Sequence, residues 1–429
     1  MFALLLSSMW IGFALFATGF AGLLLYDVTL PPTISIWDRI AQILANSIWN
    51  SLNSWALAAL PLFILMGELL YRTAISTRLM NALVPWLSNV PGRLYHVNVA
   101  ACSLFAAVSG SSAATTATVG KITLKELRRR GYDKRLAIGS LAGAGTLGFL
   151  IPPSLIMIIY GVLSDTSIGR LFMAGILPGL VLAGMYSLYI AVACLLRPEA
   201  VPASDERYSM RQRMVALKDL LPVVLLIVLV LGGIYAGLTT PTEAAAIGVL
   251  GALGLALASG SLTRTAMAES LLSTVKTTAM ICFIIAGAAF MSQMVGFVGI
   301  TRSVSQYITG LELSPYMLLF VLALMYLLLG MILDGISIVV MTLPIVLPIV
   351  VLAGFDPLWF GIFVVIMVEL SQITPPVGFS IFVIQFISRE DVGTILKATF
   401  PFFLITVFMV VLIAVFPELV FYLPNKMLR

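Results

Sequence analysis

Residues 145 to 161 read GTLGFLIPPSLIMIIYG and place a proline pair, Pro152-Pro153, inside a stretch that is otherwise apolar enough to be a membrane helix. A second pair, Pro375-Pro376, interrupts a similar apolar stretch in the other half of the chain. Proline lacks a backbone N–H and breaks a helix. Because a broken backbone in hydrocarbon is tolerated only where protein buries it or where it lines a cavity, the two breaks predict an interior site.

The composition indicates an integral membrane protein. Hydrophobic residues make up 61% of the 429 residues and charged residues only 10%. Several apolar runs reach the roughly 20 residues that a helix needs to cross a bilayer. The net charge of +5 is compatible with a nucleic acid partner. The basic residues lie between apolar stretches, however, where they set the orientation in a membrane, so we expect no nucleic acid partner.

The chain has few of the histidine and cysteine residues that hydrolases and zinc enzymes commonly use. His96 is the only histidine, and the three cysteines show no CxxC spacing. A zinc site or a Ser-His-Asp triad therefore lacks its usual residues. We expect a protein that is not an enzyme and has no organic cofactor.

Two apolar segments fit hairpins that enter and leave the membrane on one side. The segment 95–127 is interrupted by the run Ser109 to Ser112 and has arginines at both ends, whereas the segment 314–353 is interrupted at 333–335 and bounded by acidic residues. Under the positive-inside rule, the first hairpin starts and ends in the cytoplasm and the second outside. With this topology, all but five of the 24 Lys and Arg residues are cytoplasmic; the exceptions are Arg39, Arg170, Arg302, Lys426 and Arg429.

The remaining apolar stretches predict nine full spans, eight of which form two sets of opposite direction. The first set is 2–26, 47–71, 136–161 and 169–196, and the second is 243–260, 278–298, 358–387 and 399–423; the span 219–238 has no counterpart. About 43 residues separate Gly110 from Pro153, and about 41 separate Gly335 from Pro376. The chain is therefore predicted to be an all-α membrane transporter with an inverted repeat, two re-entrant hairpins and two broken helices.

We expect four parts along the chain. They are scaffold spans with a first arm helix (1–92), the first hairpin, broken helix and following span (93–196), scaffold spans with a second arm helix (197–313), and the second hairpin, broken helix and last span (314–429). The arms are the amphipathic stretches 76–91 and 301–313, which suit helices lying in the membrane interface. The hairpins and broken helices are expected to move as one body against the remaining spans.

Sodium prefers hard oxygen ligands, which unwound backbone and hydroxyl groups supply. The candidate sodium ligands are Ser109, Gly110, Ser111, Ser112, Gly145, Thr146 and Gly148 in the first half and Asp334, Gly335, Thr374, Pro376 and Gly378 in the second. A substrate carboxylate prefers the free N–H groups at helix N-termini. The candidate substrate-binding residues are Ser112, Thr115, Pro152, Pro153, Ser154, Ser337 and Pro375.

Several of these residues have a structural alternative. The small residues of the first tip also promote close helix packing, and Asp334 suits the capping of a restarting helix as well as a cation site. Glu68 fits a structural role, and Glu243 follows Thr240-Pro241-Thr242 as in a capping box. Glu369 is deep enough in its span to be a coupling residue, but pairing with a neighbouring helix is equally compatible with the sequence.

Five strings in order carry a resemblance to a known family. They are SGSSAATTATVG from Ser109, GTLGFLIPPSLIMIIYG from Gly145, TPTEAAAIG from Thr240, LDGISIVVMTLPIVLPI from Leu333 and ITPPVGFSIFV from Ile373. The chain resembles the large membrane subunit of a TRAP transporter, the DctM-like permease. It departs from the family's pattern at Ser371-Gln372, where the family has glycine followed by an apolar residue.

The resemblance implies a fold similar to elevator-type anion transporters and sodium-driven uptake of an organic acid across the bacterial inner membrane. It also implies two partners, a DctP-like periplasmic binding protein and a DctQ-like small four-helix membrane subunit. The alternatives are a stand-alone sodium/dicarboxylate symporter of similar architecture and, less favoured, a channel.

Overall fold

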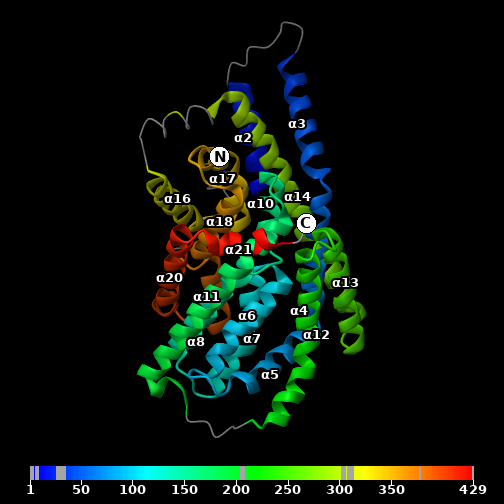
Figure 1. Ribbon diagram of the computed structural model, residues 1–429. Helices are drawn as coiled ribbons and strands as arrows, with labels where there is room; N and C mark the ends of the chain where they lie inside the picture. Colours follow the sequence, from blue (N-terminus) through cyan, green and yellow to red (C-terminus); the bar gives the residue numbers. More distant parts are fainter. Residues whose placement is uncertain are drawn as a thin grey trace.

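The protein is a helical membrane protein in the computed structural model, which describes residues 4, 9–25, 35–202, 208–300, 306, 314–375 and 378–427 (Figure 1). The described residues form α-helices and two short 3-10 helices, and no strand occurs among them. Eight of these helical segments are long and apolar enough to cross a membrane. The prediction of an all-α membrane protein is confirmed.

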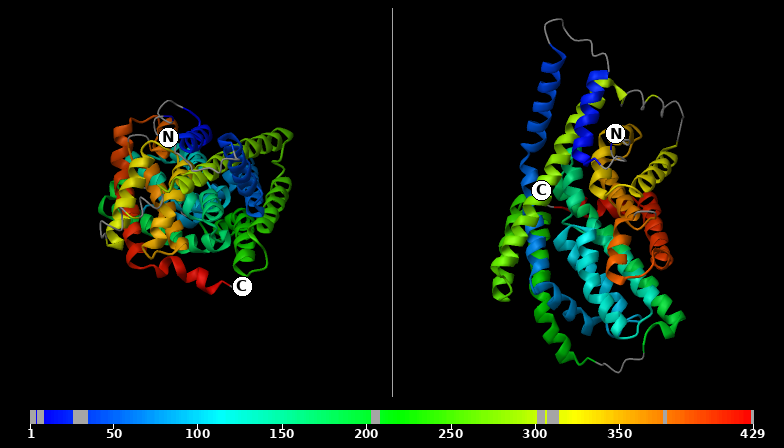
Figure 2. Two further views of the ribbon diagram at one scale, coloured as in Figure 1. Left: turned by 90° about the horizontal axis from the view of Figure 1, so that it is seen from above. Right: turned by 180° about the vertical axis from the view of Figure 1, so that it is seen from behind.

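Long helices form a scaffold along one side of the molecule, as Figures 1 and 2 show. Within it α2 packs against α14, α13 against α4, and α12 against α13. Gly19 of α2 makes room for the ring of Phe290 of α14, which shows how closely these helices approach. The scaffold helices are α2 (Ile11–Leu25), α3 (Ile36–Leu52), α4 (Ala59–Arg72), α12 (Met210–Tyr235), α13 (Pro241–Ala258) and α14 (Arg264–Val298).

The two predicted hairpins are present as helix pairs joined by short turns. Gly110 ends the first helix with φ 59°, a left-handed conformation that favours glycine, and Ser111 caps the next helix. In the second hairpin Asp334 caps the returning helix. The first pair is α6 (Leu94–Ser109) and α7 (Ser112–Arg129), and the second is α16 (Pro315–Gly330) and α17 (Gly335–Leu352).

Both predicted broken helices are also present. The first is interrupted at residues 151–154, where Pro152-Pro153 lies, and the second between Gln372 and Phe379, with Gly378 at φ 40°. Pro376 lies outside the described residues. The first broken helix consists of α8 (Lys134–Gly145), α9 (Leu147–Leu150) and α10 (Leu155–Ser164), and the second of α18 (Pro357–Gln372) and α19 (Phe379–Ser388).

The two halves pack crosswise. Helix α10, which follows the first break, packs against α17 of the second hairpin, and α19, which follows the second break, packs against α7 of the first hairpin. Likewise α6 contacts α8, and α16 contacts α18. Equivalent helices of the two halves therefore make equivalent contacts, as the predicted inverted repeat requires. We name helices α6–α10 and α16–α19 together the hairpin unit.

One further long helix follows the broken helix in each half. These two helices are α11 (Ile168–Leu196) and α20 (Val392–Val415), which contact each other as well as α8 and α18. A short helix, α21 (Glu418–Lys426), ends the described chain and packs against α11.

The span predicted at 47–71 is wrong at its start. Residues Asn53 and Ser54 separate α3 from a 3-10 turn and α4, because Asn and Ser side chains compete with the helix for backbone hydrogen bonds. The helix α3 itself was not predicted. The span predicted at 399–423 is also wrong, since Pro417 divides it into α20 and α21 and the preceding Phe416 is not helical.

Helices α12 and α14 begin among basic residues, ahead of the apolar spans predicted at 219–238 and 278–298. Helix α12 starts at Met210 with a capping box from Ser209, and α14 starts at Arg264 with Thr263 as its cap. Lys and Arg are good helix formers, and their long side chains reach the interface while the helix continues. Basic residues at the predicted cytoplasmic side can therefore be part of a helix and need not lie in a loop.

The first arm is a helix, α5 (Ile75–Leu87), which packs against α12 and α6. Its buried face contains Leu79 and Leu83, while Arg78 and Asn81 are exposed. The second predicted arm, 301–313, lies outside the described residues except for Gln306, and the four-part division of the chain stays a prediction.

Candidate functional site

The first hairpin tip and the first helix break are in direct backbone contact. The Leu155 N–H, at the start of α10, donates to the Gly110 carbonyl oxygen at 3.3 Å. A Cβ atom on Gly110 would lie 2.8 Å from the Pro153 oxygen, and one on Gly148 would overlap the backbone of Ser112. Glycine is therefore required at both positions for the tip and the break to meet.

The hydroxyl groups of this tip have partners within the hairpin unit. Ser109 Oγ lies 2.9 Å from Thr115 Oγ1, and Ser111 Oγ accepts from the Ala114 N–H at 3.5 Å. Ser112 and Thr115 are completely buried. The tip is thus a turn in which Gly110, Ser112 and Thr115 are buried and Ser109 and Ser111 are half-buried; their role as ligands stays a prediction.

The first break leaves three buried carbonyl oxygens without a hydrogen-bond donor. Within the described part of the chain, no hydrogen bond is donated to the carbonyl oxygens of Ile151, Pro152 or Pro153, and all three residues are buried. Buried carbonyl groups nearly always have a partner. Their oxygens are of the kind that Na⁺ prefers, so this break has the chemistry of a cation site.

The hydroxyl groups of two other candidates at the first break, Thr146 and Ser154, form hydrogen bonds within the protein. Thr146 Oγ1 donates to the Gly143 oxygen at 2.7 Å and lies 3.2 Å from the Tyr186 hydroxyl. Ser154 Oγ caps α10 by accepting from the Met157 N–H at 3.4 Å. Gly145 packs against Thr116 of α7. The hydroxyl of Thr146 therefore points toward Tyr186 of α11.

The second tip lies between the two halves. A Cβ atom on Gly335 would be 2.5 Å from Val368 of α18 and 3.0 Å from Ile156 of α10. The second hairpin therefore touches both broken helices at its turn. This places Gly335 beside the first break, which the sequence did not predict.

Asp334 serves as a helix cap, the alternative that the sequence left open. Its carboxylate accepts from the N–H groups of Ile336 and Ser337 at 3.1 and 3.3 Å and from the Ser337 hydroxyl. Thr374 Oγ1 donates a hydrogen bond to the Leu370 carbonyl oxygen, one helical turn earlier, at 2.7 Å. In the second half, the predicted oxygen donors Asp334, Ser337 and Thr374 thus stabilise their own helices.

Ser371 of the second broken helix lies against the second hairpin. Gly330, the last residue of α16, faces Ser371 so closely that a Cβ atom on it would overlap the serine side chain. Ser371 is fully buried, and its hydroxyl donates to the Val368 carbonyl oxygen at 2.6 Å. The serine is accommodated because its neighbour is a glycine.

Glu369 links the two halves. Its Oε1 atom accepts from Ser112 Oγ at 2.5 Å and from the Phe149 N–H at 2.6 Å. The residue belongs to α18 of the second half, while Ser112 belongs to the first tip and Phe149 to the first broken helix. The carboxyl group is completely buried. Sequence reasoning left its role open, because nothing in a single sequence identifies partners 220 to 257 residues away.

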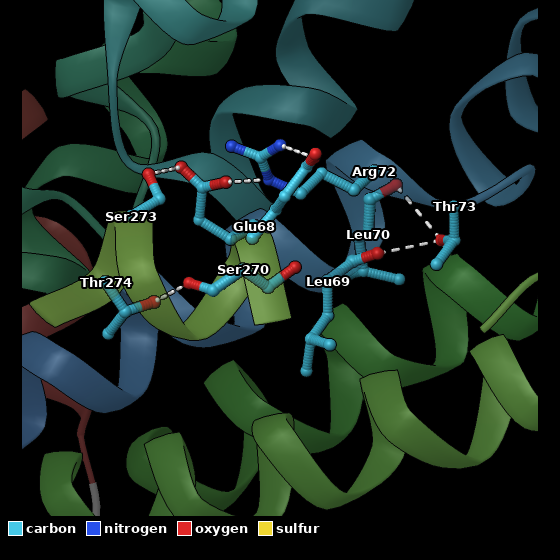
Figure 3. A network of polar contacts seen from close by, with 9 residues as sticks. Glu68, Leu69, Leu70, Arg72, Thr73, Ser270, Ser273 and Thr274 are labelled. Atoms are coloured by element: carbon cyan, nitrogen blue, oxygen red, sulfur yellow. Dashed lines mark hydrogen bonds and ion pairs between the residues drawn. The ribbon is translucent and has the colours of Figure 1, made fainter. Parts of the chain in front are cut away.

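Glu68 and Glu243 have the structural roles that the sequence favours. Glu68 of α4 forms an ion pair with Arg72 at 2.8 Å and accepts from Ser273 of α14 at 2.7 Å, and Arg72 also reaches Glu269 at 2.5 Å (Figure 3). Glu243 accepts from the Thr240 N–H at 2.7 Å in a capping box. Both residues stabilise the scaffold.

A polar cavity lies along part of the boundary between the scaffold and the hairpin unit, which elsewhere contact each other directly through α14 and α17 and through α4 and α6. Its volume is about 610 Å³, and it lies between α3 and α14 on one side and α10 and α17 on the other. The sequence analysis missed it because α3 was not predicted, although polar residues recur there at every third or fourth position. The polar lining residues include Arg39, Gln42, Asn46 and Asn50 of α3, Ser292 and Gln293 of α14, and Asp165 after α10.

The chain matches one protein family over nearly its whole length. The model of the tripartite ATP-independent periplasmic transporter, DctM component, matches residues 1–419. The C4-dicarboxylate TRAP transporter large permease protein DctM of Pseudomonas aeruginosa is 34% identical over 383 residues, which cover 89% of each chain. The sialic acid TRAP transporter large permease protein SiaM of Vibrio cholerae is 29% identical and covers 99% of this chain and 97% of its own.

A solved structure supports the fold. The YdaH transporter of Alcanivorax borkumensis, described as having an unusual topology, superposes with a TM-score of 0.68 over 96% of this chain and 98% of that one, at 14% identity. The spans and the relatives indicate a multi-pass protein of the bacterial inner membrane. The chain belongs to the DctM family, the large permease subunits of tripartite ATP-independent periplasmic transporters.

Proposed function

We propose that this protein takes up an organic acid across the inner membrane, driven by a sodium gradient. The observation that carries the proposal is the junction of the first tip with the first break, where the carbonyl oxygens of residues 151–153 are buried without donors. Such oxygens bind sodium in a dry interior. The relatives from Pseudomonas aeruginosa and Vibrio cholerae are named for C4-dicarboxylates and sialic acid, which are carboxylic acids.

The substrate carboxylate is proposed to bind where helices restart beside this junction. Helix α7 begins at Ser112, and α10 begins at Leu155 after Ser154. Their first N–H groups and helix dipoles favour an anion. The N-terminus of α17 already has a carboxylate, Asp334, as its cap. The first-half helix ends are therefore the better partners for an acid.

We propose that the hairpin unit moves against the scaffold by an elevator mechanism. The polar cavity of about 610 Å³ lies along part of the boundary between the two, where α14 and α17 also contact each other, and α5 connects α4 of the scaffold to α6 of the unit. The interlocked tips and breaks let the unit move as one body. Arg39, the cavity's arginine, would attract the anionic substrate on its way to the junction.

The family's tripartite nature leads us to propose two partners, a periplasmic substrate-binding protein and a small membrane subunit. The test is uptake into proteoliposomes that contain this chain, with each partner and the sodium gradient left out in turn. Uptake is expected only when all are present. Uptake by the chain with sodium alone would favour the stand-alone symporter, and a sodium-independent conductance would favour a channel.

Movement is tested by a cross-link through the cavity. In a variant without the native cysteines, Ala289 of α14 and Leu163 of α10, which line the same cavity, are replaced by cysteine and joined by a bifunctional maleimide. Uptake is expected to stop after cross-linking, while either single cysteine variant treated with the same reagent remains active. Undiminished uptake by the cross-linked protein would overturn the elevator mechanism.

A further inference from the structure

We propose that a basic pocket at the predicted cytoplasmic end of the hairpin unit binds an anionic phospholipid. The pocket has a volume of about 900 Å³, which is within the range of cavities that bind small molecules. It lies between the C-terminal half of α7, the start of α8 and the end of α19. None of its lining residues belongs to the two tip–break junctions, so this site does not depend on the proposed transport function.

The side chains that line the pocket carry an excess of positive charge. Its charged lining residues are Lys121, Lys125, Arg128, Lys134, Arg389 and Glu390. Glu390 pairs with Lys134 at 2.7 Å. Within the described ranges of the chain, the other four basic side chains of the pocket form no ion pair. The pocket is therefore suited to a ligand that brings its own negative charge.

Three of these basic residues share one face of α7. Lys121, Lys125 and Arg128 follow one another at intervals of four and three residues. Residues at this spacing lie one above the other along a helix. All three side chains are exposed, so their charges are accessible to a ligand in the pocket.

The three consecutive arginines at the end of α7 have different surroundings. Arg129 and Arg130 both pair with Glu126 at 2.6 Å, and none of these three residues lines the pocket. Arg128 lines the pocket and has no ion pair among the residues described. An acidic partner on the same helix is therefore available to the arginines outside the pocket, while the arginine inside it is left for a ligand.

The apolar part of the lining favours a lipid over a small anion. Leu124, Ile138 and Phe386 line the same pocket as the basic residues. Phe386 is 83% exposed, and Phe382 and Phe379, one and two turns earlier on the same face of α19, are 46% and 49% exposed. Exposed aromatic side chains of a membrane helix suit contact with lipid. A phospholipid would place its phosphate among the basic side chains and an acyl chain along these rings.

The predicted topology places the pocket at the leaflet where such a lipid is found. All five basic residues of the pocket are among those that the sequence predicts to be cytoplasmic. Anionic lipids of the cytoplasmic leaflet attract basic segments, and basic pockets between membrane helices on this side suit their headgroups. Lys and Arg form charge-assisted hydrogen bonds with a phosphate. A free organic acid would use the basic side chains and leave the phenylalanines without a partner.

The test is native mass spectrometry of the purified full chain, titrated in detergent with phosphatidylglycerol or with phosphatidylcholine. We expect phosphatidylglycerol to bind at least about tenfold more tightly, because the choline group brings a positive charge to a basic pocket. Equal affinity for the two lipids would overturn the proposal. Displacement of phosphatidylglycerol by an equal concentration of inorganic phosphate or succinate would also overturn it, since the pocket would then be a site for small anions.

Neighbouring arginines supply a matched pair of variants. Arg128→Gln is expected to weaken phosphatidylglycerol binding about fivefold, whereas Arg129→Gln removes the same charge outside the pocket and leaves the affinity unchanged. Equal weakening in both variants would show attraction by net charge alone and would overturn the site. Phe386→Gln, with both basic neighbours intact, should weaken binding several-fold, and wild-type affinity in this variant would overturn the acyl-chain contact. Both arginines are exposed, and an unchanged Tm without added lipid checks that the variants fold.

Discussion

The two tip–break junctions are related by the inverted repeat but differ in chemistry. At the first, backbone meets backbone through Gly110 and Gly148, and three carbonyl oxygens remain free. At the second, Gly330 accommodates the side chain of Ser371, and the carboxylate of Asp334 is used as a helix cap. The inverted repeat therefore determines where the two junctions lie, and the local sequence determines which groups each junction offers to a ligand.

The first junction is the one that suits the proposed ligands. Its break is buried and the N-termini of α7 and α10 are capped by serines without a carboxylate, which is why we place the proposed cation and acid sites there. The second junction is held by side chains that stabilise its own helices. Glu369 connects the two, because it extends from the second broken helix to the first tip.

The largest effect is expected from closing the first junction. Replacing Gly148 by valine places a side chain into the backbone of Ser112, and overpacking of about 1–3 kcal/mol or more would displace the tip and lower uptake at least about tenfold. The measurement is the initial rate in proteoliposomes. Gly184→Ala is the control, since nothing lies within 4 Å of a Cβ there; equal rates for both variants would contradict the contact.

The second junction is tested by exchanging its two partners. Gly330→Ala alone is expected to reduce uptake several-fold, because the new methyl group overlaps Ser371. Adding Ser371→Gly removes that overlap and should restore much of the rate. Failure of the double variant to exceed the single one would show that the two positions do not act on each other.

Variants of Asp334 distinguish a helix-capping role from a cation-binding role at the second junction. Asp334→Ala removes a helix cap and is expected to lower stability by about 1 kcal/mol, measured as a lower Tm, whereas Asp334→Asn keeps the cap. If Asp334 only caps, the asparagine variant has wild-type sodium half-saturation. A raised half-saturation in Asp334→Asn would support the predicted sodium role.

The smallest effect is expected in the scaffold, away from both junctions. Glu68 and Arg72 are 21% and 26% exposed, and such pairs contribute up to about 1 kcal/mol. Glu68→Gln should change Tm slightly and leave the sodium half-saturation of uptake unchanged. A loss of uptake as large as that of Gly148→Val would place this ion pair in the transport cycle and end the contrast between scaffold and hairpin unit.

The membrane class, the two hairpins and the two broken helices could be predicted from the amino-acid sequence alone. These follow from local chemistry: Pro152-Pro153 cannot continue a helix, Gly110 adopts a left-handed turn, and Ser111 and Asp334 cap the helices after them. The capping box of Glu243 was predictable for the same reason. Each of these signals lies within a few residues of the structure that it produces.

Which of these parts contact each other depends on the three-dimensional packing of the chain. Helix α3 lines the cavity although it is not part of a long apolar run. The contacts of Glu369 with Ser112, of Gly330 with Ser371 and of Gly335 with Ile156 join separate elements of the fold. Close packing selects such pairs in three dimensions, and a single sequence carries no local signal of them.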